Sequence, residues 1–338
     1  MRGVRSQRDQ TRRTGFVLPA VGAIVIGLVG TLAPATSWAS SRPAWSAPIR
    51  IEPASVAPDN VSVYGLSCAT SRMCVATDAA GFALVWSHGR WSRPQEAYRG
   101  GTLDSISCPS VSFCIALSSG GTAVTYDGRT WSQPVRVGPS ASYEVSCPTT
   151  SFCSGVGAPG LAGASSTIAM LEHGTWSSFQ TSTTGAVSDR LLGVSCPSAT
   201  FCVAVNFDGH ILTFNGRRWS AGTAAILKGL DSVSCSSGGF CMAVSGSGAY
   251  ETLEHGSWSR ARIIPGFRSQ FARSLSCTSS GSCDVFGLAG TVAQWRGGRW
   301  SKPLKVFPGG FTGTVTVSCA SGRHCAAVNS RGQAAISR

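Results

Sequence analysis

Fourteen cysteines form seven pairs with the same C-x5-C spacing, and each pair opens one copy of a repeat whose period lies in the low forties. No cysteine is left over, so the spacing predicts one disulfide for every copy. Seven residues after the second Cys of each pair there is a Gly, and in most copies a Trp follows ten residues later. The predicted pairs are Cys68/Cys74, Cys108/Cys114, Cys147/Cys153, Cys196/Cys202, Cys235/Cys241, Cys277/Cys283 and Cys319/Cys325.

Each copy contains four short apolar runs separated by turn residues, which predicts four antiparallel strands. The third turn contains Asp127-Gly128 in the second copy, and His-Gly, Asn-Gly or Gly-Gly in others, which are dipeptides of type I′ hairpins. Four strands and one Trp per repeat are typical of β-propeller blades. The sequence therefore predicts an all-β protein, a seven-bladed β-propeller with four-stranded antiparallel blades and one disulfide per blade.

The seventh copy ends before its Trp, whereas the segment AWSAP, with Trp45, precedes the first Cys pair. We expect this N-terminal strand to join the last blade and to close the ring. Each Trp should fill the space between the outer strands of neighbouring blades. A Ser precedes the first Cys in every copy, so we expect it to pack between blades and to bond to the backbone rather than to act as a nucleophile.

The segments ISCPSVSFCIAL and YDGRTWSQP resemble the repeats of uncharacterised secreted bacterial propellers of an actinobacterial type, and the resemblance covers residues 45–338. The hairpins are also distantly similar to those of Asp-box (BNR) propellers such as sialidases. In this sequence Asp127 and Gly128 are adjacent, one residue closer than in the Asp-box motif. The first resemblance implies a secreted propeller, and the second implies a glycoside hydrolase.

The first 39 residues predict an export signal. Five arginines precede an apolar stretch from Phe16 to Leu32, and SWAS offers a cleavage site after Ala39. An uncleaved membrane anchor is the alternative reading of this segment. We therefore expect a signal peptide over 1–39, a propeller domain over 40–338, and a secreted or extracellular location. That location agrees with the cysteines, because disulfides persist outside the cytoplasm.

Candidate binding residues should break the repeat pattern, because residues shared by every copy serve the blade. The connection from each Trp to the next Cys varies in length, and in a propeller these connections share one face with the turns between the second and third strands. Positions near the start of the inner strands also differ between copies. The predicted ligand-binding residues are Tyr64, Asp104, Tyr143, Asp189, Arg190, Asp231, Phe267, Arg268, Phe271 and Arg273.

No catalytic motif, cofactor motif or metal-ligand set is recognisable, so we predict no catalytic residue, no cofactor and no metal. An extracellular binding or scaffold module for a polysaccharide or a protein is the favoured function. A propeller-type glycoside hydrolase, for which Asp104 and Asp231 are the candidate carboxylates, and a purely structural cell-envelope protein are the alternatives.

The formal net charge is +13, and subtracting the +4 of the leader leaves +9 for the mature chain. A basic rim at the third turns could therefore contact anionic wall polymers. We expect a monomer that does not bind nucleic acid and contacts a membrane only if the leader stays uncleaved. The arginines of the rim are Arg90, Arg129, Arg217, Arg218 and Arg299.

Overall fold

In the computed structural model, the described part of the chain contains strands and turns and no helix. It comprises residues 45–52, 62–139, 141–158, 165–181, 190–220, 223–224, 228–236, 239–268, 270–308 and 313–337. No stretch of these residues forms a helix long and apolar enough to cross a membrane. The predicted leader, residues 1–39, lies outside the described residues.

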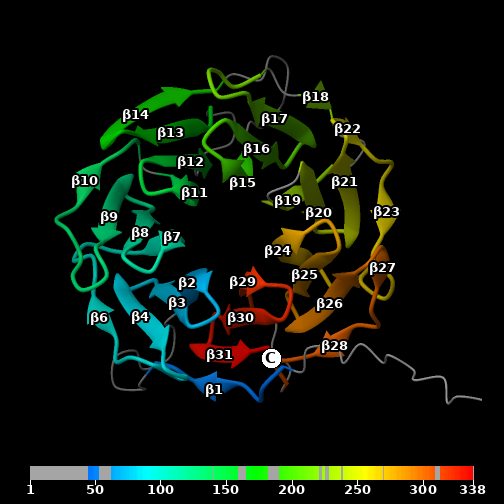
Figure 1. Cartoon of the computed structure of the whole chain (residues 1–338), viewed down its shortest axis with the longest axis horizontal. Coiled ribbons are helices and arrows are strands. Elements are labelled where there is room, and N and C mark those ends of the chain that lie inside the picture. The colour runs from blue at the N-terminus through cyan, green and yellow to red at the C-terminus, as the bar shows by residue number, and fades with distance from the viewer. Residues whose placement is uncertain are drawn as a thin grey trace, which may run out of the picture. The chain divides into compact units, whose positions relative to one another are not determined.

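Seven antiparallel sheets surround a central axis (Figure 1), which confirms the predicted seven-bladed β-propeller. The inner strands are β2 (Val63–Thr70), β7 (Leu103–Ser110), β11 (Ser142–Thr149), β15 (Leu191–Ser198), β19 (Leu230–Ser236), β24 (Ala272–Ser279) and β29 (Val315–Ser321). The second strands are β3 (Met73–Asp78), β8 (Phe113–Ser118), β12 (Phe152–Ala158), β16 (Phe201–Asn206), β20 (Phe240–Ser245), β25 (Ser282–Gly287) and β30 (His324–Asn329).

The third strands are β4 (Phe82–Ser87), β9 (Thr122–Tyr126), β13 (Thr167–Glu172), β17 (His210–Phe214), β21 (Ala249–Glu254), β26 (Thr291–Arg296) and β31 (Gln333–Ile336). In blades one, five and six the outer strand is split into two short halves that both pair with the third strand. The outer strands are β5 (Arg90–Trp91), β6 (Gln95–Glu96), β10 (Val135–Arg136), β14 (Thr175–Gln180), β18 (Thr223–Ala224), β22 (Ser257–Trp258), β23 (Arg262–Ile263), β27 (Arg299–Trp300), β28 (Leu304–Lys305) and β1 (Ile49–Arg50).

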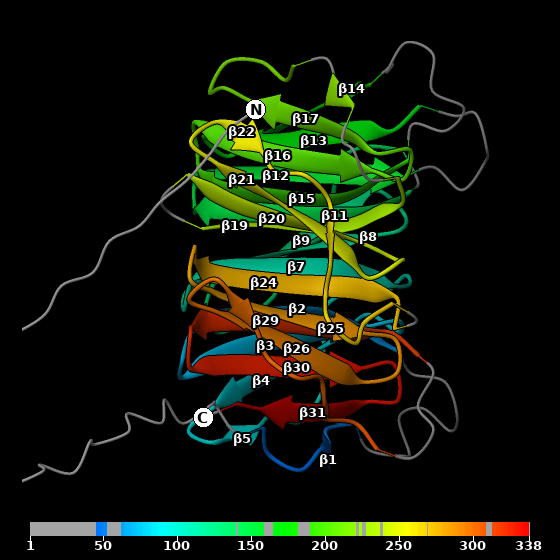
Figure 2. The same cartoon turned by 90° about the vertical axis from the view of Figure 1, so that its right-hand side faces the viewer.

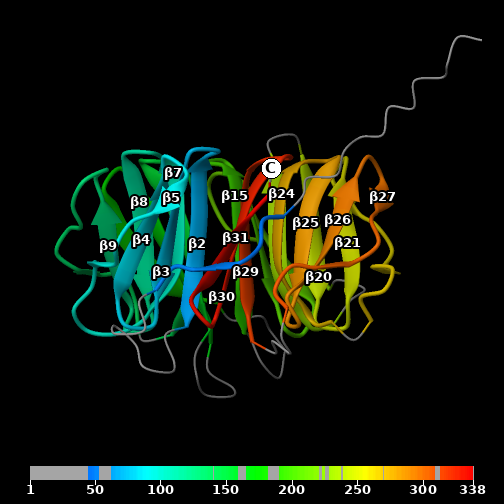
Figure 3. The same ribbon diagram turned by 90° about the horizontal axis from the view of Figure 1, so that it is seen from below.

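The N-terminal strand closes the ring, as predicted. β1 pairs with β31, with Ile49 opposite Ala334 and Arg50 opposite Gln333. Edge-on views show β1 beside β31, on the outer side of the last blade (Figure 2, Figure 3). Blade seven therefore takes three strands from the C-terminal end of the chain and one from the N-terminal end, which gives it the four strands of the other blades.

All seven predicted disulfides are present, and no described cysteine is free. Each joins the inner strand of a blade to the second strand of the same blade, with Cα–Cα distances from 3.9 to 4.1 Å. No disulfide joins two blades, so contacts between blades depend on other interactions.

The second cysteine of four pairs is completely buried, which the spacing alone does not predict. The predicted pairing is confirmed, and each of these side chains also lies inside an apolar cluster between two blades. The second strand runs through the interior of its blade, so residues near its start are already covered by the neighbouring blade. These cysteines therefore contribute to the packing between blades as well as to the disulfides. They are Cys114, Cys153, Cys202 and Cys241, each 0% exposed.

Apolar packing holds neighbouring blades together. The core is divided into seven clusters, and each lies between two neighbouring blades with a partly buried Trp packed against it. Trp45 of blade seven meets Phe286 of blade six edge to face, with ring centroids 5.2 Å apart, and Trp300 of blade six meets Tyr250 of blade five at the same distance. The predicted role of the Trp residues between blades is therefore confirmed.

A ring of serine hydroxyls provides a second interaction between blades. The Ser before the first Cys of each blade accepts a hydrogen bond from the backbone N–H of that Cys in the next blade, at 2.9 to 3.0 Å. The ring closes when Ser318 of blade seven accepts from Cys68 of blade one. The predicted structural role of these serines is confirmed, and they are Ser67, Ser107, Ser146, Ser195, Ser234, Ser276 and Ser318.

The third turns follow the type I′ prediction in some blades and depart from it in others. His88, His173 and His255 have φ near +50°, and each precedes a Gly with positive φ, as that turn requires. Asp127 does not adopt a positive φ. Its Oδ1 instead accepts the N–H groups of Arg129 and Thr130, both at 2.8 Å, because an aspartate before a Gly can cap the turn with its own side chain.

Candidate functional site

The start of every inner strand lies on one face of the propeller, which we call the entry face. In blade one Val63 pairs with Asp78, the last residue of the second strand, so the turn after Asp78 lies at the same end as the start of the inner strand. The other blades have the equivalent pairing. We call the opposite face, which carries turns such as His88-Gly89, the hairpin face.

Bulges place a distinct set of side chains at the entry end of the axis. In five blades an extra residue separates two ladder pairs at the start of the inner strand. A bulged residue has no partner of its own, and its side chain is redirected. These five residues are Tyr64, Asp104, Leu192, Asp231 and Arg273, and four of them are predicted ligand-binding residues.

Blade three lacks this bulge, and the prediction for Tyr143 is wrong for that reason. Tyr143 pairs with Gly157 and occupies the buried position that Val63 has in blade one. Its hydroxyl donates to the carbonyl of Pro139 at 3.0 Å, and only 1% of the residue is exposed. The next residue, Glu144, is exposed instead.

Phe267 is the second predicted ligand-binding residue that the structure corrects. It is completely buried in the apolar cluster between blades five and six. A large apolar side chain in a connection can anchor that connection to the core, and here the anchor leaves no surface for a ligand. The adjacent Arg268 is exposed, as are Tyr64, Arg190 and Arg273, whereas Asp189 lies outside the described residues.

Three predicted residues come together at the junction of blades five and six. A Cβ atom at Gly246 would lie 2.8 Å from Asp231 Oδ2 and 3.8 Å from the ring of Phe271. Both side chains therefore lie over this glycine. Desolvation raises the pKa of the Asp231 carboxyl, whereas the charge of Arg273 and the N–H of Gly246 lower it. Gly246 thus provides the space in which a carboxylate, a guanidinium and an aromatic ring share one small surface.

Phe271 has an uncommon backbone conformation. Its φ is +48°, and 53% of the residue is exposed. A bulky residue in the left-handed region is an outlier, and such strain is often found at functional sites. The fold does not need this ring for its core, so its exposure marks Phe271 as a candidate for ligand contact.

A second cluster lies at the junction of blades two and three. Ser105 donates to Glu144 Oε2 at 3.1 Å, and Asp104 accepts the backbone N–H of Tyr143. Desolvation raises the pKa of Asp104 to about 6. The pKa of Glu144 is raised to about 7, chiefly because the surrounding protein desolvates its carboxyl group. The hydrogen bond from Ser105 lowers this pKa, and the negative charge of Asp104 raises it. These two carboxyl groups therefore change charge near neutral pH.

The exposed phenylalanine and tyrosine side chains of the described residues lie at or near the entry end of four different blades. The exposed phenylalanines and tyrosines of the described chain are Tyr64, Phe179, Phe207 and Phe271. Phe207 follows the second strand of blade four, and its N–H donates to the carbonyl of Arg190 in the connection before that blade. Phe179 pairs with Ile168, next to the entry end of β13. Phe179, Phe207 and Glu144 are not among the residues predicted from the sequence, although a comparison of the copies marks Phe207 as a residue peculiar to its turn.

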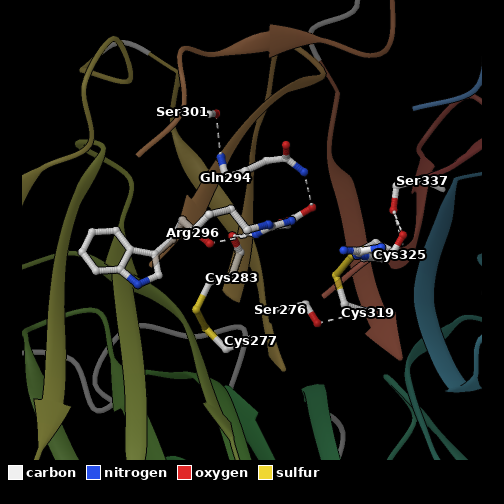
Figure 4. Close-up of polar contacts among 12 residues, drawn as sticks. Ser276, Cys277, Cys283, Gln294, Arg296, Ser301, Cys319, Cys325 and Ser337 are labelled. Carbon is white, nitrogen blue, oxygen red and sulfur yellow. Dashed lines mark hydrogen bonds and ion pairs between the residues drawn. A yellow bond between two sulfur atoms is a disulfide. The ribbon is translucent and has the colours of Figure 1, made fainter. Parts of the chain in front are cut away.

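Asp284 lies in a separate buried cluster between blades six and seven. Its Oδ1 is 2.5 Å from Arg296 Nη2, and its Oδ2 accepts from Gln294 at 3.1 Å. Figure 4 shows Arg296 and Gln294 between the disulfides Cys277–Cys283 and Cys319–Cys325. Asp284 and the last two cysteines are close enough to share an ion, but both sulfurs are in a disulfide and so cannot act as thiolate ligands. The cluster is a structural ion pair.

Comparisons with known proteins place the chain among β-propellers. No protein-family model matches the sequence, and no curated protein matches it. A solved structure of YCF48 bound to D1 peptide matches 87% of this chain and 94% of its own, with 12% identity and a TM-score of 0.66. The WD40 propeller domain of Doa1 matches 87% and 97%, with 13% identity and a TM-score of 0.68. Virginiamycin B lyase from Staphylococcus aureus matches 87% and 99%, with 6% identity and a TM-score of 0.69. Identities this low show a shared fold alone.

Proposed function

We propose that the protein is an extracellular binding module whose entry face holds a segment of another extracellular protein. The observation that carries this proposal is that the exposed side chains of Tyr64, Phe207 and Phe271, in three different blades, all lie at the entry face. Aromatic side chains beside charges of both signs, such as Asp231 and Arg273, are enriched in protein recognition surfaces. The seven disulfides support a location outside the cytoplasm, with residues 1–39 as the export signal.

The fold comparisons agree with this class of function without specifying it. One of the similar propellers was solved with a peptide bound, so the architecture can present a peptide-binding surface. A cell-envelope polysaccharide remains the alternative ligand, because aromatic rings also stack on sugars. The proposed likeness to secreted bacterial propellers fits both ligands.

The hydrolase alternative has less support. Asp104 belongs to blade two and Asp231 to blade five, and the carboxyl group adjacent to Asp104 is that of Glu144. A glycosidase needs two carboxyl groups on either side of one bond, held at a defined separation. We therefore place the sialidase-like activity behind binding, and the structural cell-envelope role behind both.

The hairpin face supports an additional contact with anionic wall polymers. The rim arginines named above are exposed, and within the described residues none of them forms an ion pair. Such a contact would weaken as salt rises, because exposed charges are screened. A ligand of the entry face that depends on aromatic burial would be retained.

The test is a screen of the oxidised protein, residues 40–338, against a displayed peptide library and an array of wall polysaccharides. For any ligand found, we expect Phe271→Ala and Asp231→Ala to weaken binding about tenfold, the loss of roughly 1.4 kcal/mol that a well-placed contact supplies. Val111→Ala, which removes an exposed apolar side chain from the hairpin face, is the matched control.

The screen distinguishes the alternatives. Peptide ligands that are lost on entry-face substitution would support the proposal, whereas selective glycans would establish the polysaccharide alternative. Ligands lost on the Val111 substitution but retained by both entry-face variants would overturn the choice of face. Absence of any ligand would favour the structural role.

A further inference from the structure

A pocket of about 390 Å³ lies at the third turn of blade four, on the hairpin face. Its walls come from the end of β17, from the turn that follows and from the chain just after that turn. Phe214 pairs with Trp219 as an isolated bridge, which holds the two arms of the turn together. Ligand pockets in proteins have volumes of about 300 to 1,000 Å³, so this one is large enough for a small ligand. The lining residues are Thr213, Asn215, Arg218, Trp219 and Ser220.

The turn supplies this pocket with hydrogen-bond donors that have no acceptor. The guanidinium of Arg218 is exposed, and within the described residues it forms no ion pair. Asn215 Oδ1 accepts the N–H groups of Arg217 at 3.1 Å and Arg218 at 3.0 Å, so the amide NH₂ of Asn215 remains as a donor. A positive charge beside a free donor suits a negatively charged oxygen group.

Two hydroxyl groups add one more donor. Ser220 Oγ accepts the N–H of Thr213 at 3.0 Å, and the two hydroxyl oxygens are 3.1 Å apart. A hydrogen bond between two hydroxyls uses only one of their two protons. The equivalent Ser132 of blade two donates to the carbonyl of Gln133 at 2.9 Å, whereas among the described residues of blade four no further acceptor contacts Thr213 or Ser220. One O–H group is therefore available to a ligand.

Blade two has the same turn with the opposite charge. Asp127 stands in the position of Asn215, and its Oδ1 accepts the two equivalent N–H groups, both at 2.8 Å. Asp127 Oδ2 accepts from the hydroxyl of Thr130, at 3.1 Å, and Thr130 stands where blade four has Arg218. The turn therefore forms with either an acid or an amide. The fold does not require the amide and the arginine of blade four, so their presence together indicates a ligand.

An indole forms the apolar wall of the pocket. Trp219 is partly buried against the cluster between blades three and four, and its ring centroid is 5.6 Å from that of Phe214. The sequence after Trp219 differs from that of other blades, because the Pro that follows Trp-Ser-x in blades one, two, six and seven is replaced by Gly222. A guanidinium beside an aromatic ring suits a ligand that joins an anionic group to an apolar ring face. A charged sugar has both features.

We propose that this pocket binds one anionic sugar unit of a wall polymer, with its carboxylate or phosphate group on Arg218 and Asn215 and its ring against Trp219. Arginine binds both kinds of oxyanion through paired hydrogen bonds. This inference rests on the proposed contact between the hairpin face and anionic polymers, and it assigns the specific part of that contact to blade four. The other rim arginines then supply a general attraction that salt screens.

The test measures the binding of short oligosaccharides to the oxidised protein, residues 40–338, by titration calorimetry. The probes are galacturonic acid oligomers, hexose oligomers joined by phosphodiesters, and neutral galactose oligomers of the same length. We expect at least one of the two anionic probes to bind and the neutral probe not to bind, because the donors of the pocket require an anionic group. The comparison of the carboxylate probe with the phosphodiester probe identifies which group the pocket takes.

Substitutions in the turn separate the pocket from the rest of the rim. Arg218→Ala should weaken binding about tenfold or more, because it removes charge-assisted hydrogen bonds. Arg129→Ala, which removes the rim arginine of blade two, is the matched control and should leave binding unchanged. Asn215→Asp should weaken binding at least as much as Arg218→Ala, since it adds a negative charge to the pocket. The unfolding temperature of Asn215→Asp should stay unchanged, because Asp127 caps the same turn in blade two.

The outcomes distinguish this proposal from the general contact of the rim. Equal losses in Arg218→Ala and Arg129→Ala, undiminished binding in Asn215→Asp, or equal binding of the neutral oligomer would each overturn the pocket. If short oligomers do not bind but a long anionic polymer binds at low salt, the pocket proposal is wrong and the rim contact stands. Failure of the long polymer as well would overturn both.

Discussion

Asp104 and Glu144 give the entry end of the axis a charge that depends on pH. Their pKa values are raised to about 6 and about 7, in both cases chiefly through desolvation by the surrounding protein. Glu144 stays in contact with solvent, so screening limits the energy involved. A ligand with a cationic group would bind this junction better at pH 8 than at pH 5, since both carboxyl groups are then ionised.

The same groups make stability depend on pH in a predictable direction. A carboxyl group whose pKa is higher in the folded state than in the unfolded state binds its proton more tightly when folded. Its contribution to stability is therefore present below the unfolded value of 4.5 and is lost as pH rises toward about 7. We expect the unsubstituted protein to lose stability relative to Glu144→Gln across this window, as measured by urea unfolding at several pH values. A constant difference between the two proteins would contradict the assignment.

The repeat spacing predicts whole strands better than the positions of single residues. Counting back from the first Cys identified Asp104, Asp231 and Arg273 as axis residues, because their blades share a bulge. The same count misplaced Tyr143, because the inner strand of blade three begins without the bulged residue that five of the other blades have. Tyr143 therefore pairs with the second strand and is buried. A bulge is a property of backbone pairing, which residue spacing does not reveal.

At the scale of elements, the same Ser hydroxyl joins the inner strand of every blade to that of the next blade. The Ser hydroxyl replaces the backbone ladder that blades cannot form with each other, and it satisfies an N–H that the disulfide turn leaves free. A serine is small enough for the two strands to approach closely. The repeat therefore keeps a Ser where a larger residue would separate the blades.

Removing one of these hydroxyls should have a measurable cost. Ser195→Ala leaves the N–H of Cys235 without its acceptor, which is 2.9 Å away in the folded protein. We expect a loss of about 1 kcal/mol in the free energy of unfolding, measured by urea unfolding with the disulfides intact. Ser110→Ala is the control, because the Ser110 hydroxyl forms a hydrogen bond within its own turn, with the exposed Ser112, and not with a neighbouring blade. Equal stability of both variants would show that the ring of serines contributes nothing.

The strands and disulfides could be predicted from the sequence more fully than the exposed side chains of the connections. The four strands, the disulfide positions and the packing of the Trp residues follow from features that recur in every copy, and one copy with an unclear pattern is corrected by the other six. Phe179 and Phe207 recur nowhere, so repetition says nothing about whether they are buried. Exposure depends on the path of each connection, which neither composition nor spacing specifies.

For the whole molecule, closure joins the two ends of the chain in one sheet. β1 covers the outer edge of β31, which would otherwise present unpaired backbone groups. Trp45 also packs against blade six, through its contact with Phe286. The first described residues are therefore part of the fold rather than an appendage to it.

Two truncations test this dependence. A chain that begins at Trp45 should unfold at the temperature of the 40–338 protein, whereas one that begins at Pro53 loses β1, Trp45 and Glu52 together. We expect the shorter chain to unfold at a temperature lower by several degrees and to self-associate through the free edge of β31. Unfolding temperature and light scattering provide the measurements. A monomeric shorter chain of unchanged stability would show that closure is dispensable.

The local disulfides also have a consequence for biogenesis. Fourteen thiols could pair in a very large number of ways, and wrong pairs would trap an exported chain. Here each correct partner is only six positions away and within one hairpin. Short loops close faster than long ones, so every pair can oxidise as soon as its hairpin forms. Oxidation can thus proceed blade by blade, and the N-terminal strand can dock onto blades that are already cross-linked.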